Sequence, residues 1–164
     1  MFRTYAMTLI ADDGTDIGGP LALPLTASRK KAVLGEWLDA HQDLMDALDP
    51  AKPADGQPSR PRRDITPREL VGLQVRLEAA VGIAILRMLP DGHPLREHYE
   101  GGEHAAAPEP WLLYGTALVE RLADVGVLVS DLQEHLNAAT VSVGRTPSEK
   151  EVAAAEGNSD ATPK

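Results

Sequence analysis

The chain has 164 residues, a net charge of −9 and no cysteine, and aromatic side chains make up only 4% of it. The lack of cysteine excludes disulfides and thiolate metal sites, and the negative charge argues against broad contact with nucleic acid phosphates. With so few aromatic side chains the core must be aliphatic, which favours a mainly α fold over a β-sandwich.

Residues 1–25 are predicted to form an N-terminal β-arm or short hairpin. β-forming residues fill 2–10, the turn signal Asp12-Asp13-Gly14 follows, and glycines and prolines then interrupt the return strand. A two-stranded hairpin is marginal alone, so the arm should pack on the chain's own helices or add to a partner's sheet. In the second case, Tyr5 and Met7 are candidate contact residues.

Targeting signals are missing from the first residues. The start of the chain lacks a basic segment followed by an apolar one, and no apolar run approaches the roughly 20 residues that span a bilayer. We therefore expect a cytoplasmic or virion protein that is not secreted by a signal peptide and has no membrane contact.

A first helix is predicted over about 27–48. Apolar residues recur at i, i+3, i+4 and i+7, and His41 falls within the stripe. We expect His41 to be a histidine at the edge of the core, with a ligand or proton donor as the alternative. The residues of the predicted buried stripe are Leu34, Trp37, Leu38, His41, Leu44, Met45 and Leu48.

The central helix is predicted over about 67–89. Thr66 and Glu69 form a capping-box pattern, and Pro67 suits the first helical turn. One apolar face carries leucines 70, 73 and 77, and a second carries Val71, Val75, Gly82, Ile85 and Leu89. A helix that is apolar on two faces needs partners on both sides.

A proline-rich connection, 49–65, separates these two helices. It has no hydrophobic periodicity and contains Arg60, Arg62 and Arg63 close together. Such a long connection within a domain is unusual and is often functional. The three arginines are candidates for contact with a phosphate or an acidic partner surface, and a solvated linker is the alternative.

A second connection, 90–110, holds His93, His98 and His104 among several glutamates. Imidazole and carboxylate groups are ligands for zinc, so these histidines are the candidate metal ligands, although their spacing matches no known motif. A polar surface loop is the alternative, and we expect no cofactor. Arg87 and His93 also resemble the R-x4–6-H pattern of helical-bundle ribonucleases of the HEPN type, which implies action on a phosphodiester.

The last helix is predicted to run unbroken over 111–137. Trp111, Leu118, Val125 and Leu132 recur every seven residues, which predicts a continuous seam for packing in a bundle or against a second subunit. Beyond it, 140–164 is polar and is expected to be an extended or disordered tail.

The sequence therefore predicts a mainly α fold, with a bundle of three main helices, an N-terminal β-arm, two long connections and a tail. We expect a non-enzymatic structural subunit of an oligomeric complex, such as a phage virion or neck component, with protein partners or further copies of itself. One alternative is an acidic regulatory module, such as an antitoxin or inhibitor, that binds a basic partner. The other is a metal-dependent or ribonuclease-like enzyme that uses the loop from His93 to His104.

Overall fold

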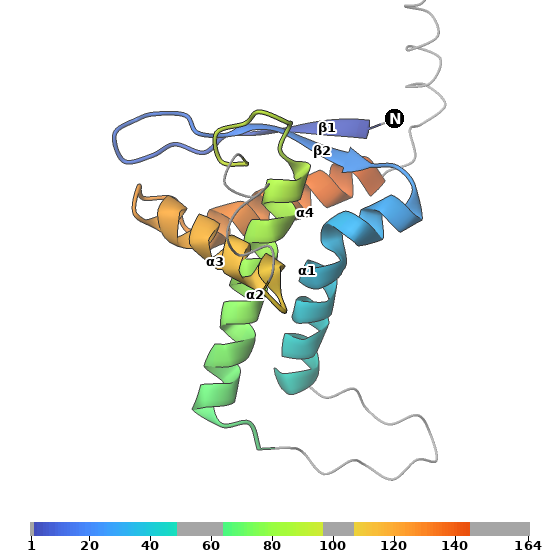
Figure 1. The fold of residues 1–164 in the computed structure, drawn as a ribbon, viewed down its shortest axis with the longest axis vertical. Helices are drawn as coiled ribbons and strands as arrows, with labels where there is room; N and C mark the ends of the chain where they lie inside the picture. Colours follow the sequence, from blue (N-terminus) through green and yellow to red (C-terminus); the bar gives the residue numbers. More distant parts are fainter. Residues whose placement is uncertain (1, 49–63, 97–106, 145–164) are drawn as a thin grey trace, which may run out of the picture.

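The computed structural model describes residues 2–48, 64–96 and 107–144 (Figure 1). As predicted, this part of the chain is mainly helical and begins with a short antiparallel hairpin. The elements in chain order are β1 (Phe2–Met7), β2 (Gly19–Pro24), α1 (Ala27–Leu48), α2 (Pro67–Met88), α3 (Pro110–Ala123) and α4 (Val129–Gly144).

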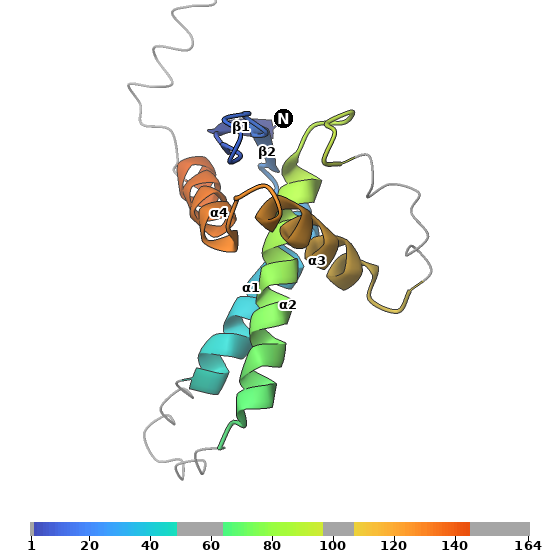
Figure 2. The same ribbon diagram turned by 90° about the vertical axis from the view of Figure 1, so that its left-hand side faces the viewer.

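Helix α2 is the centre of the fold. Its C-terminal half, from Ala79 to Met88, is buried almost throughout. Helix α1 runs along one side of it and α3 crosses the other, while α4 and the hairpin cover its C-terminal end (Figures 1 and 2). Leu21 and Leu23 from β2 and Leu132 and Leu136 from α4 complete this core.

The start of α2 matches the prediction. The backbone N–H of Glu69 donates to Thr66 Oγ1 at 3.3 Å, and the Thr66 N–H donates to the Glu69 carboxylate at 3.0 Å. This capping box satisfies backbone donors that have no partner inside the helix. It fixes the helix start far from the body of the molecule.

The crossing of α2 and α3 depends on two glycines. A Cβ atom at Gly82 would lie 2.5 Å from the backbone oxygen of Gly115, and a Cβ at Gly115 would collide with the backbone of Ala79. The two helix backbones therefore touch at this point, and residues with side chains would hold them apart. This close contact ties α3 to the middle of α2.

The hairpin packs on the chain's own helices. Its strands pair from Phe2 opposite Pro24 to Met7 opposite Gly19, and the ladder ends at a turn in which Gly14 has a φ of 84°. A positive φ is readily adopted by glycine, as the turn signal predicted. The hairpin thus closes one end of the helical core.

The expectation of one unbroken helix over 111–137 is wrong. Helix α3 ends at Ala123, and α4 begins at Val129. Between them Gly126, with a φ of 89°, donates to Ala123 O at 3.1 Å, and Val127 donates to Leu122 O at 2.9 Å. These two bonds form a Schellman motif, which terminates a helix.

The turn after α3 also contacts the hairpin. The Asp12 N–H donates to Val125 O at 2.8 Å, and a side chain at position 126 would collide with the Asp12 carboxylate. The heptad spacing from Trp111 to Leu132 therefore belongs to two helices rather than to one seam. Helix α4 then continues to Gly144, so the first residues of the predicted tail are helical, and 145–164 lies outside the described residues.

Candidate interaction surface

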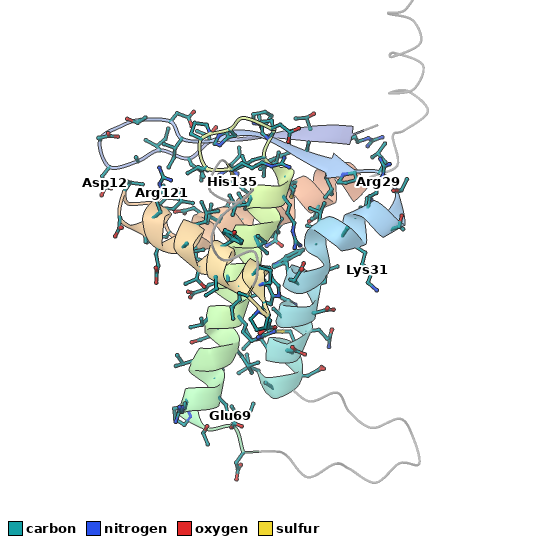
Figure 3. All side chains as sticks on the ribbon, in the orientation of Figure 1. Asp12, Arg29, Lys31, Glu69, Arg121 and His135 are labelled. Carbon is teal, nitrogen blue, oxygen red and sulfur yellow. The ribbon has the colours of Figure 1, made fainter. Side chains whose placement is uncertain are left out.

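The outer halves of α1 and α2 form a two-helix projection, defined here as residues 38–48 and 67–78. They extend side by side beyond the crossing with α3, away from the hairpin and α4 (Figures 1 and 2). Glu69 lies near the free end of the projection (Figure 3). Leu44 is buried between the two helices, and the leucines at 70, 73 and 77 are partly buried. With Ala40, which is also buried, these residues form a narrow seam.

One side of the projection is apolar and exposed. Five large aliphatic side chains there are between 41% and 56% exposed, and we call them the apolar face: Leu38, Met45, Leu48, Val71 and Val75. The sequence prediction placed the three α1 residues in a buried stripe, and the structure corrects it. Periodicity shows that a helix has an apolar side, but it does not show whether another element covers that side.

Helical geometry places Leu38, Met45 and Val71 toward the same side of the pair, and Leu48 and Val75 follow Met45 and Val71 by about one turn. Leu38 and Met45 follow the buried Trp37 and Leu44 by one residue, and Val71 follows Leu70, so each is rotated by about 100° from the line of contact. Because α1 and α2 are antiparallel, the same sense of rotation brings residues of both helices to one side.

On both helices, the residues immediately before those at the α1–α2 contact are mostly charged. They lie on the side of the projection opposite the apolar face. On α1 these are the exposed Asp39, Asp43 and Asp46. On α2 the Arg76 guanidinium donates to both Glu109 oxygens, at 3.1 and 3.2 Å, and lies over the Trp111 ring. A partner that covers the apolar face would therefore remove few charged groups from water.

The Arg76 contacts agree with this division of the projection. The hydrogen bond with Glu109 raises the pKa of Arg76. Burial lowers this pKa by a smaller amount, and the negative charge of Asp43 raises it further. Asp43 is therefore close enough to Arg76 for its charge to act on the guanidinium. The acidic residues of α1 and the apolar face point in different directions.

The predicted contact residues of the arm do not form an exposed surface. Met7 is 3% exposed and belongs to the core, so the expectation that it contacts a partner is not supported by its position. Tyr5 is partly buried, and its hydroxyl lies 3.1 Å from His135 Nδ1, whose Nε2 lies 3.0 Å from Thr8 O (Figure 3). The arginines Arg60, Arg62 and Arg63 lie outside the described residues.

Of the three candidate metal ligands, His93 lies in the described part of the chain. His93 Nε2 lies 3.3 Å from Gly18 O of the hairpin, and its Nδ1 accepts a hydrogen bond from Leu95 N of its own loop at 3.2 Å, so both ring nitrogens have partners within the fold. His98 and His104 lie outside the described residues. His41 is exposed rather than part of the core, and its ring centroid is 6.4 Å from that of Trp37.

Arg87 has a structural partner of its own. Its guanidinium donates to both oxygens of Glu36, at 3.0 Å for the Nη2 bond, and to Ala32 O at 3.2 Å. Burial raises the pKa of Glu36, but the hydrogen bonds and charge of Arg87 outweigh it, and the net pKa is lowered. Arg87 and His93, the pair that resembles the ribonuclease pattern, are thus engaged with different parts of the fold.

The described residues contain neither a cluster of metal-binding side chains nor a membrane-spanning helix. No group of three or more metal-binding side chains lies together in 2–48, 64–96 and 107–144, and none of the helices there is long and apolar enough to cross a bilayer. Neither a scan of protein-family models nor searches of curated proteins and of solved structures found a match to this chain. The apolar face is therefore the feature from which a function can be argued.

Proposed function

We propose that the protein is a non-enzymatic structural subunit of a protein assembly, and that the apolar face of the α1–α2 projection is its main contact surface. The observation that carries this proposal is the exposure of five large aliphatic side chains on one side of two helices. A single exposed leucine needs no explanation, but a contiguous apolar patch is typical of an interaction site.

The shape of the projection supports the same proposal. The projection buries few side chains within its own chain, so it contributes little to the core. A partner that covers it would explain both its apolar composition and how it is stabilised. Burying five such side chains would contribute roughly 1–2 kcal/mol each before the costs of association. We propose a virion or neck assembly as the setting, on the basis of architecture alone.

The charged side of the projection favours a second candidate function. Asp39, Asp43 and Asp46 lie at i, i+4 and i+7 on α1, all exposed. A row of carboxylates on a helix attracts a basic surface, as in the acidic regulatory modules that cover a basic partner. In that case, changes on the charged side would weaken binding more than changes on the apolar face.

The experiment compares the size of the native complex with and without the apolar face. In extracts of cells that make the protein, the tagged wild-type chain should elute in a complex larger than one chain, and a Val71→Asp/Val75→Asp variant should shift toward the size of the free chain. The matched control, Asp39→Ala/Asp43→Ala, should remain in the complex. A shift by the control alone would favour the acidic regulatory module, and a wild-type chain that elutes free would contradict the proposal.

A further inference from the structure

No segment of this chain has the composition to cover the apolar face. Besides Met1, the segments outside the described residues are 49–63, 97–106 and 145–164, which contain no leucine, isoleucine, methionine, phenylalanine or tryptophan and only Tyr99 and Val152 as larger apolar side chains. Covering five aliphatic side chains requires apolar side chains of comparable area. These segments are therefore poor occupants, and a second chain is the better one.

Helix α2 carries a stripe of four exposed residues that is symmetric about its own midpoint. Arg68, Val71, Val75 and Glu78 follow one another at spacings of three, four and three residues, so they lie along one side of the helix. We call them the α2 stripe. The two valines are central, and the two ends carry opposite charges. Within the described residues, neither Arg68 nor Glu78 takes part in an ion pair.

This stripe matches an antiparallel copy of itself. If two α2 helices cross with position 73 of each on a two-fold axis, Val71 of one copy faces Val75 of the other, and Arg68 faces Glu78. The pairing occurs twice, as an interface with two-fold symmetry requires. A partner of unrelated sequence gives no reason for opposite charges at equal distances from the centre.

We propose that the apolar face binds a second copy of this chain, with the two α2 stripes antiparallel. This inference rests on the proposed function, and it names the partner at the same surface. Met45 and Leu48 of α1 are further exposed apolar side chains of the same projection. The acidic row of α1 lies on the opposite side, so two copies can meet here without bringing those carboxylates together.

The size of the face sets the affinity that we expect. An interface confined to two helix halves is at the small end of specific interfaces, which corresponds to a dimer that dissociates on dilution. The oligomeric state must therefore be measured over a concentration series.

The test is light scattering of the full chain after size-exclusion chromatography, from low to high micromolar concentration. The wild type should form dimers, and Arg68→Glu or Glu78→Arg should each raise the dissociation constant roughly tenfold, because each places two pairs of like charges in the interface. The double variant Arg68→Glu/Glu78→Arg should restore wild-type affinity. Asp39→Arg on the charged side changes the net charge as much as Glu78→Arg does and should leave the dimer unchanged.

Each outcome bears on one claim. A wild type that is monomeric at every concentration overturns the second copy as partner, and the native-complex experiment then decides the proposed function separately. An oligomer that resists both single charge changes, or a double variant that fails to recover, overturns the antiparallel stripe while an assembly role stands. Because Arg68 and Glu78 are exposed, unfolding curves should show that all variants remain folded.

Discussion

The two halves of α2 belong to one helix, but they differ in apolar content and in their surroundings. From Ala79 onward, α1, α3, α4 and the hairpin surround the helix, whereas from Pro67 to Glu78 α1 runs beside it and the start of α3 reaches it at Arg76 (Figure 2). Val81 is fully buried, and Val75, less than two turns earlier, is 45% exposed. The comparison shows that the half beyond the α3 crossing keeps apolar side chains exposed, and that these are available to a partner.

Truncating a valine in each half should give the largest difference. Val81→Ala removes buried methyl groups and leaves a cavity, and it should lower the free energy of unfolding by roughly 2–3 kcal/mol. Val75→Ala in the projection should change it by less than about 0.5 kcal/mol. Urea unfolding at a concentration that keeps the chain monomeric measures both. Equal losses would mean that the projection is covered by its own chain.

A glycine at the α2–α3 crossing and a glycine in the projection should respond with opposite signs. Gly115→Ala drives a methyl group into the Ala79 backbone at the α2–α3 crossing, and we expect a loss of about 1–3 kcal/mol. Gly72→Ala in the projection meets no atom within 4 Å and should stabilise the monomer by roughly 0.5–1 kcal/mol, because alanine favours the helix. Melting temperatures of the two variants test this, and a stabilising Gly115→Ala would show that the crossing is looser than described.

The ion pair between Arg87 and Glu36 gives a smaller effect that depends on pH. Because the folded state lowers the pKa of Glu36 below its ordinary value of 4.5, its stabilisation is full above that pH and is lost as the pH falls through the folded pKa. We expect Glu36→Gln to cost about 1 kcal/mol at pH 7, since the pair is partly exposed. The difference from wild type should shrink at pH 3, and a difference that grows in acid would contradict the sign.

Local signals predicted much of the fold. The turn at Gly14 and the capping box at Thr66 are short motifs whose geometry depends on neighbouring residues, and both form as expected. The break at Gly126 was missed because the heptad spacing continued across it. The sequence did contain a signal for the break, which is a glycine followed five residues later by Asp131. Asp131 accepts a hydrogen bond from Leu128 N at 3.0 Å at the start of α4.

The candidate surface could be predicted only in part. The second apolar face of α2 was visible in the sequence, and so was the need for a partner on that side. What the sequence could not show is that α3 covers that face at Gly82 and leaves Val71 and Val75 open, because this depends on contacts between residues far apart in the chain. On α1 and α2, charged residues come before the residues of the helix contact and apolar residues come after them. This pattern could be recognised only once the contact residues were known.

The most direct test of the central claim is disulfide trapping across the proposed two-fold axis. The chain has no cysteine of its own, so introduced cysteines can be read without background. We predict that Val71→Cys and Val75→Cys proteins, mixed and mildly oxidised, form a linked dimer much faster than either protein alone, since position 71 faces position 75 of the other copy. An Asp43→Cys protein mixed with either one should not link. Equal linking in the single proteins and in the mixture, or none in any of them, would contradict the antiparallel α2 interface.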